Sequence, residues 1–425
     1  MFPDHDYGCD NGDKHFQHKY ETTNAFIDFI GEPVESSMAQ RAANGLGVFG
    51  VKLFDFGRIQ GQELVPDHEA CIDPDAICVA SNLDEPMYSN RTVAVFVLDV
   101  RTNKDPWLEG NHAYYPSEVI GDFLGPDQWQ WFEQAISNSK ATVNVVVSGL
   151  QVNANLFTNP NIAESWSAFP RSQQRLMDAI LGDSVSSPIL ISGDVHMTQL
   201  MRKDCRRRSD LGQQRPVVEM TTSGMTHSWG RVNSRPLDHP DYQPSIRERI
   251  EVFVGGTAMH FLHQLRPWTQ LMMSSDDPTI THDGGMESAK TGLQYSLERN
   301  FGELEFDWEE RTVALRSIGE DGRPLLSSKI QMDQLSGKSL MKTSFLSEDE
   351  FQREIAEQHP LVAGEWVCLP YRGRVGVMHE MLGHVRSVLA IVTFFTLPVL
   401  VPAYLLVRRR RKSKPAAGSC TSSKG

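Results

Sequence analysis

Apolar runs that read as buried strands alternate with helical segments between residues 93 and 222, and this alternation most constrains the fold. The strand-like runs are Val93–Val100, Val143–Gly149, Ile189–Ile191 and Val217–Thr222, and the helical segments are Asp127–Ser139 and Pro170–Leu181. In Asp127–Ser139, Trp129, Phe132 and Ile136 share one face, as in an amphipathic helix that packs on a core. Strand–helix–strand order of this kind predicts an α/β domain built in layers.

The segment Pro188–Leu200 carries the clearest candidate for chemistry. Ser192 and Gly193 stop a short apolar strand, and Asp194 and His196 follow two residues apart. A carboxylate offers a hard oxygen, and a neutral imidazole offers a nitrogen that suits iron, zinc or manganese. The motif is short and common, so the spacing alone leaves a second interpretation open, a polar turn in which Asp194 caps the next helix.

Polar residues also follow the other predicted strands. Asp99 and Arg101 close Val93–Val100, where they can build a site or pair with each other, and we favour the pairing. Gln151 lies just past the next strand, within reach of a substrate. His227 follows Val217–Thr222 and either lines the site or is an ordinary loop histidine.

Seven blocks of the sequence, taken together and in order, resemble the PhoD-like (alkaline phosphatase D) metallophosphoesterase family. They are HDYGCDNGDKHF at His5–Phe16, VFVLDVR at Val95–Arg101, LGPDQWQWFEQAISNS at Leu124–Ser139, SGLQV at Ser148–Val152, FPRSQQRLMDAI at Phe169–Ile180, SGDVH at Ser192–His196 and TTSGMTHSW at Thr221–Trp229. The resemblance implies a layered metallophosphoesterase-like β-sandwich flanked by helices. It also implies a metal-dependent hydrolase, a phosphatase or phosphodiesterase acting on phosphate mono- or diesters.

The resemblance also implies roles for individual residues. His5 matches the catalytic histidine that contacts the phosphate and can protonate the leaving group. The implied metal ligands are Asp4, Asp194 and His196, with Asp10 as a further candidate, and the implied substrate-binding residues are Gln151, His227 and Arg101. Iron and calcium are the metals that the family implies, and the mixed oxygen and nitrogen donors would also accept manganese or zinc. The family's Asn-Asp pair is inverted here to Asp10-Asn11, so we assign Asn11 no metal role.

The amino end lies inside a family motif. Relatives read tryptophan-Asp-Asp-His-Asp where this chain reads Met1-Phe2-Pro3-Asp4-His5-Asp6, and no apolar signal segment precedes the motif. We therefore expect the domain to be incomplete at its amino end, without the first Asp ligand and the Gly-Asp motif of the family. A second class of function stays open on this basis, namely a non-catalytic, membrane-anchored domain that keeps the fold but lacks a complete metal site.

The carboxyl end reads as a membrane anchor. Val388–Val407 has no charged residue and is long enough to span a bilayer, and RRRRKSK follows at Arg408–Lys414. By the positive-inside rule we expect a cytoplasmic tail over residues 408–425 and a lumenal or extracellular domain. A buried core helix followed by a basic tail is the alternative.

Charge and cysteine usage complete the sequence-based account. The chain carries a formal charge of −13, and before residue 388 it has 34 Lys and Arg against 54 Asp and Glu, so we expect no nucleic-acid partner. We place the catalytic domain at residues 1–334, with insertions at 58–92 and 232–300, and a membrane-proximal stem at 335–387. Cys71 and Cys78 can pair in an oxidising lumen, and the other four cysteines have no obvious partner.

Overall fold

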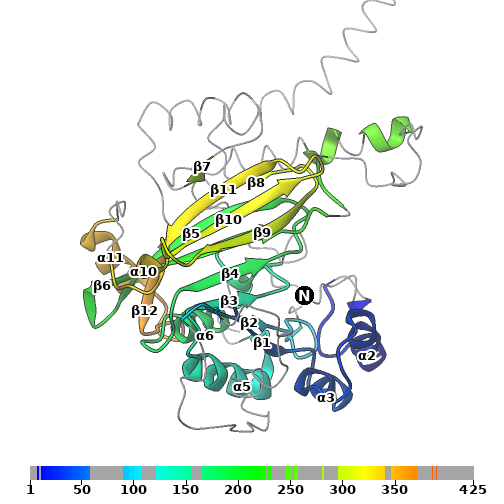
Figure 1. Ribbon diagram of the computed structural model, residues 1–425, viewed down its shortest axis with the longest axis horizontal. Coiled ribbons are helices and arrows are strands. Elements are labelled where there is room, and N and C mark those ends of the chain that lie inside the picture. The colour runs from blue at the N-terminus through cyan, green and yellow to red at the C-terminus, as the bar shows by residue number, and fades with distance from the viewer. Residues whose placement is uncertain are drawn as a thin grey trace, which may run out of the picture.

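The structure is a computed structural model in which two sheets pack face to face and helices cover the outer face of the larger one (Figure 1). It describes residues 7–8, 11–57, 90–106, 121–154, 164–225, 227–230, 245–250, 253–256, 280–281, 295–339 and 346–370, together with Val385 and Leu389.

The larger sheet has the strand order β1-β2-β3-β4-β6-β5-β12, and β8 pairs with β5. Its strands are β1 (Gly50–Asp55), β2 (Thr92–Val97), β3 (Val143–Val147), β4 (Pro188–Ser192), β5 (Thr198–Arg207), β6 (Asp210–Thr222), β8 (Tyr295–Ser296) and β12 (Trp366–Pro370). The strands β2, β3, β4 and β6 run parallel, whereas β1, β5 and β12 are antiparallel to their neighbours. The parallel strands therefore direct their carboxyl ends to one edge of the sheet.

The smaller sheet is antiparallel and has the order β7-β11-β10-β9. Its strands are β7 (Ile280–Thr281), β9 (Asn300–Asp307), β10 (Thr312–Gly319) and β11 (Pro324–Gln331). The strands β9 and β10 form an antiparallel hairpin. Side chains from both sheets share one apolar core, with Val143 and Ile189 from the larger sheet and Val313 and Leu315 from the smaller.

The helices α5 (Gly125–Asn138) and α6 (Pro170–Ile180) cover the other face of the larger sheet. Successive strand residues point to opposite faces, so Val93 of β2 faces the smaller sheet while Ala94 and Phe96 face the helices. Further helices in the described part of the chain are α2 (Lys19–Ile30), α3 (Ser37–Ala43), α10 (Met332–Leu335), α11 (Glu348–Glu357) and the short 3₁₀ helix η2 (Trp166–Ala168). The helices α2 and α3 pack beside β1.

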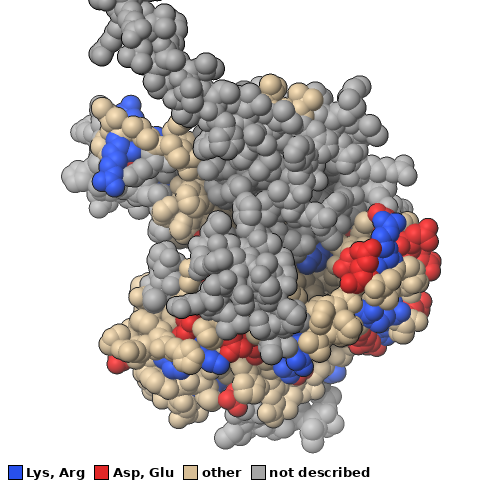
Figure 2. All heavy atoms as spheres, turned by 180° about the vertical axis from the view of Figure 1, so that it is seen from behind, with Lys and Arg blue, Asp and Glu red and all other residues tan. Residues whose placement is uncertain are grey.

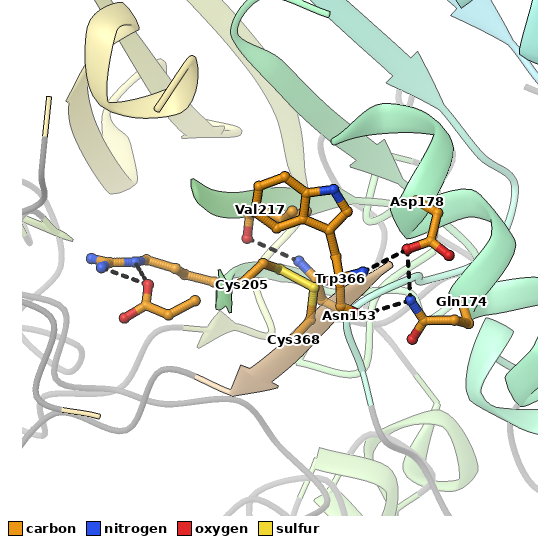
Figure 3. The surroundings of a disulfide bond; sticks show 9 residues. Asn153, Gln174, Asp178, Cys205, Val217, Trp366 and Cys368 are labelled. Carbon is orange, nitrogen blue, oxygen red and sulfur yellow. Dashed lines mark hydrogen bonds and ion pairs between the residues drawn. A yellow bond between two sulfur atoms is a disulfide. The ribbon is translucent and has the colours of Figure 1, made fainter. Parts of the chain in front are cut away.

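Part of the predicted stem at residues 335–387 belongs to the main sheet. β12 pairs with β5, and a disulfide joins Cys368 to the directly opposite Cys205, 163 residues earlier (Figure 3). On the helix side of the disulfide, Asp178 of α6 accepts the backbone N–H groups of Glu365 and Trp366 at 3.2 and 2.9 Å. The cysteine pair expected from sequence, Cys71 and Cys78, lies outside the described residues.

Basic residues of β5 and its turn hold this carboxyl-terminal segment in place. The Arg206 guanidinium lies 4.6 Å from the centre of the Phe351 ring, and Arg207 pairs with Glu365 at 3.0 Å. Arg208 donates to the Gly364 carbonyl at 2.8 Å.

On the face seen in Figure 2, the acidic and basic side chains of described residues lie next to one another and form no broad basic surface.

The expected fold class included a transmembrane helix at residues 388–407, and this part of the prediction is wrong. No helix in the described part of the chain is long and apolar enough to cross a membrane. Of the span itself, only Leu389 is described. The bilayer contact, the lumenal or extracellular location and the cytoplasmic tail stay predictions.

Candidate functional site

Four polar segments meet where the parallel strands end. Asp99 and Arg101 follow β2, Gln151 follows β3, Asp194 and His196 follow β4, and His227 follows β6. The segments are in contact, because Arg101 reaches Asp194, Gln151 bonds to β6 at Thr221, and the rings of His196 and His227 lie 4.2 Å apart. The sheet topology thus gathers residues that are up to 128 positions apart in sequence, from Asp99 to His227.

Asp194 and His196 lie on a tight reversal between β4 and β5, named here the 194–196 turn. Both residues have left-handed backbones, with φ of 76° and 52°. This conformation is costly for residues other than glycine and is concentrated at functional sites. A strand rather than a helix follows the turn, so the alternative in which Asp194 caps a helix is wrong.

Trp229 and His227 hold the 194–196 turn from the other side. The Trp229 indole N–H donates to the Val195 carbonyl at 2.9 Å, and the Trp229 backbone N–H donates to the His196 carbonyl at 3.3 Å. The His196 and His227 rings each lie 6.2 Å from the Trp229 ring. His227 therefore lies at the turn itself, although whether it binds substrate stays a prediction.

Asp99 organises the backbone and does not pair with the Arg101 guanidinium, so that predicted ion pair is wrong. Its carboxylate accepts the backbone N–H groups of Val48, Arg101 and Thr102 at 2.8–2.9 Å and the Thr102 hydroxyl at 2.6 Å. Gly47 lies close by with φ of 120°, and a Cβ there would come within 2.7 Å of Asp99 Oδ2. This approach explains why glycine is required before Val48.

The Arg101 guanidinium lies instead in a buried cluster with Glu164 and Lys104. It pairs closely with Glu164, and Lys104 Nζ lies 3.2 Å from the other carboxylate oxygen. Arg101 Nη2 lies 3.8 Å from Asp194 Oδ1. Burial lowers the pKa of Lys104, and the negative charge of Glu164 opposes that shift.

Gln151 belongs to a buried polar network beneath the strand ends. Its side-chain NH₂ donates to Thr221 Oγ1 at 2.9 Å and to Gln199 Oε1 at 3.2 Å. Next to it, Glu219 accepts the Ser192 hydroxyl and the backbone N–H groups of Val152 and Asn153, and burial raises its pKa. The Gln151 side chain is fully buried and its NH₂ group is bound to protein partners, so its predicted contact with substrate stays a prediction.

The described residues include only some of the side chains that were predicted to bind a metal ion. Asp194 and His196 lie together at the turn, and their oxygen and nitrogen atoms fit iron, zinc or manganese. The other predicted residues Asp4, His5 and Asp10 lie outside the described residues. Within the described ranges, no group of three or more His, Cys, Asp and Glu side chains is placed to hold a metal, so these residues alone do not make a complete site.

Two members of the site were not found by sequence reasoning, Lys104 and Glu164. Lys104 lies in a polar turn, and Glu164 lies two residues before the η2 helix. Neither belongs to a motif or a periodic pattern. The one sequence signal is their position next to the VFVLDVR and FPRSQQRLMDAI blocks.

The chain is similar to known PhoD-like proteins over part of its length. A solved structure titled "Structure of PhoD" is similar at a TM-score of 0.42 and 12% identity, over 78% of this chain. The chain spans 52% of the length of that structure, and a likeness at this level carries no argument about function. No curated protein sequence matches the chain. Residues 90–251 match the family model of PhoD-like phosphatases, a range that contains Arg101, Asp194, His196 and His227. The similarity to this family is thus shown for the part of the chain that carries the strand ends and the 194–196 turn.

Proposed function

We propose that this protein is a metal-dependent hydrolase of phosphate mono- or diesters and that the reaction takes place at the 194–196 turn. The observation that carries the proposal is the family match over residues 90–251, because the segments that meet at the strand ends lie inside it. Phosphatases of this family are generally metal-dependent. Iron and calcium are the metals we propose on the family resemblance, with manganese or zinc compatible with the donor atoms.

The chemistry sets requirements for the residues at this site. Hydrolysis of a phosphate ester needs an activated water, cationic groups that neutralise the phosphoryl oxygens, and an acid for the leaving alkoxide. A metal, when bound, supplies the activated water and part of the positive charge. In the proposal, Asp194 and His196 contribute donor atoms, and the hydrogen bonds from Trp229 hold the backbone that carries them. His5 is the proposed acid, on the family resemblance.

The test is hydrolysis by the full-length natural protein. The substrates are p-nitrophenyl phosphate and bis(p-nitrophenyl) phosphate, with p-nitrophenyl sulfate as the control ester, in the presence of calcium with iron, manganese or zinc. The variant Asp194→Asn removes one donor charge and is expected to lower kcat/KM by at least about 100-fold. The matched control is Asp183→Asn, because Asp183 is exposed and pairs with Arg207 far from the turn.

We expect turnover of at least one phosphate ester by the natural protein and by Asp183→Asn, and little turnover by Asp194→Asn. Two outcomes contradict the proposal. One is a natural protein that hydrolyses neither phosphate ester with any of these metals. The other is an Asp194→Asn variant that keeps the natural turnover.

A further inference from the structure

Three buried charges and the partly exposed Asp194 form a continuous row at the 194–196 turn. Lys104 Nζ lies 3.2 Å from Glu164, Glu164 pairs closely with Arg101, and Arg101 Nη2 lies 3.8 Å from Asp194 Oδ1. The side chains of Lys104, Glu164 and Arg101 are at most 2% exposed, and that of Asp194 is 18% exposed. We name these four residues the charge row. Burying such charges costs desolvation free energy, and the close pairing within the row offsets part of that cost.

The far end of the charge row holds the segment of residues 11–14. Lys104 Nζ donates to the Asn11 carbonyl at 3.2 Å, and the Lys104 carbonyl accepts the Lys14 backbone N–H at 3.0 Å. The row therefore connects the residue 11–14 segment to the 194–196 turn, which comes about 180 residues later in the chain.

Backbone strain is concentrated at both ends of the row. Of the five non-glycine residues with positive φ in the described part of the chain, three are Asn11, Asp194 and His196. Such conformations persist only where the surrounding contacts determine them. The charge row touches both strained segments, so it is placed to supply such contacts.

The Arg101 guanidinium has N–H groups that can donate a hydrogen bond to Asp194. Its Nε and Nη2 atoms are buried and have no hydrogen-bond partner among the described residues, although Nη1 is held by Glu164. Buried donors are seldom left unpaired in native proteins. The carboxylate oxygen that Nη2 faces is Asp194 Oδ1, and a movement of about 1 Å would convert this 3.8 Å approach into a charge-assisted hydrogen bond.

We infer that Arg101 is a positioning residue for Asp194, and that Glu164 and Lys104 hold Arg101 for this task and couple the residue 11–14 segment to the 194–196 turn. The inference rests on the proposed function in one respect, namely that Asp194 is a ligand of the metal. It gives Arg101 a role different from the substrate contact that the sequence implied. The fully buried guanidinium acts on the carboxylate, and the carboxylate faces the site.

Glu164→Gln is the informative variant because it keeps the shape of the side chain and removes the charge between two cations. Arg101 and Lys104 are then left buried without their shared counter-charge, which weakens the whole row. The matched control is Asp178→Asn. Asp178 is a partly buried carboxylate with several hydrogen bonds, but it supports β12 and not the turn.

The first readout is amide hydrogen exchange of the metal-free full chain. We expect Glu164→Gln to raise exchange at least about tenfold in both peptides of interest, residues 11–17 and residues 193–198. Asp178→Asn should raise it only around Glu365 and Trp366. Unchanged exchange in either of the two peptides of Glu164→Gln would overturn the inference.

The second readout is the affinity of the full chain for Mn²⁺ without substrate, measured from the electron paramagnetic resonance signal of free Mn²⁺. We expect Glu164→Gln to lower this affinity about 10–100-fold, the typical effect of losing a group that orients a metal ligand. Arg101→Lys, which keeps the charge, should restore part of the affinity lost in Arg101→Ala, and Asp178→Asn should bind as the natural protein does. Equal Mn²⁺ affinity in Glu164→Gln and the natural protein, with only the KM for ester raised, would overturn the inference and return Arg101 to a substrate contact.

The two proposals fail in different ways. A natural protein that binds no Mn²⁺ and hydrolyses no phosphate ester contradicts the proposed function. The hydrogen-exchange experiment still decides whether the charge row couples the two segments, because it needs neither metal nor substrate.

Discussion

Stability should depend on the oxidation state of Cys205 and Cys368. Their disulfide joins residues 163 positions apart, so it removes many conformations from the unfolded chain. In the chain-entropy treatment, a loop of this length corresponds to about 5 kcal/mol of stabilisation at 25 °C. That is a large share of the roughly 5–15 kcal/mol by which single domains are stable.

Reduction should weaken the fold without releasing β12 at once. Trp366 and Val367 are buried, and Asp178 keeps its hydrogen bonds to the start of the strand. With a urea dependence of about 3 kcal/mol/M, a loss of about 5 kcal/mol lowers the urea midpoint by roughly 1.7 M. The assay is urea unfolding followed by tryptophan fluorescence, with and without reductant.

The control for this experiment is the double variant Cys205→Ala/Cys368→Ala. Its midpoint should match that of the reduced natural chain and should not respond to reductant. A thiol count must confirm that the reductant has opened the bond. If the opened natural chain keeps the midpoint of the oxidised one, the disulfide has no part in stabilising the carboxyl-terminal segment and the reasoning is refuted.

Three further predictions concern single side chains. His196→Ala should lower metal content and turnover together, by more than about 100-fold, whereas His227→Ala should be milder, and equal losses measured by metal analysis and kinetics would contradict this. Arg215→Met should lower the free energy of unfolding in urea by about 3 kcal/mol or more, because the carbonyls of Leu181, Val185 and Leu335 lose the buried guanidinium that donates to them. Burial lowers the pKa of Lys203 to about 8, so between pH 8 and 10.5 the unfolded chain binds more protons than the folded one and stability should rise with pH by about 3 kcal/mol. Lys203→Met should lack this rise when the two chains are unfolded in parallel over that pH range.

The elements that the sequence predicted well are those with a strong local pattern. The runs near β2, β3 and β4 are continuous in apolar residues, and the α5 segment places Trp129, Phe132 and Ile136 on one buried face. Such patterns depend on neighbours in the chain, so they can be recognised without knowing the fold.

The strands that sequence reasoning missed owe their burial to distant partners. β5 carries Arg202, Lys203, Arg206 and Arg207, and this composition does not read as a strand. It is buried because β12 pairs with it and because acidic and aromatic residues of the carboxyl-terminal segment cover its basic side chains. The strand β1 likewise pairs with a strand that is distant in sequence, β2.

The candidate site shows the same division. Asp194 and His196 were predicted because one short motif contains both, and the sheet then brings His227 to them. Asp99 and Arg101 were predicted to pair because they are close in sequence, but the preferred partner of Arg101 is Glu164, 63 residues away. A buried ion pair between distant residues leaves no local pattern, so it could not have been found without the fold.

The central claim is that phosphate esters are hydrolysed at the 194–196 turn with a metal held there. The most direct measurement is anomalous X-ray scattering from crystals of the full-length natural protein loaded with Mn²⁺. The account predicts a manganese peak bonded to the Asp194 carboxylate and a ring nitrogen of His196, on the side of Asp194 that Arg101 does not face. A protein that hydrolyses phosphate esters but binds its manganese elsewhere, with none at Asp194 and His196, would contradict the account.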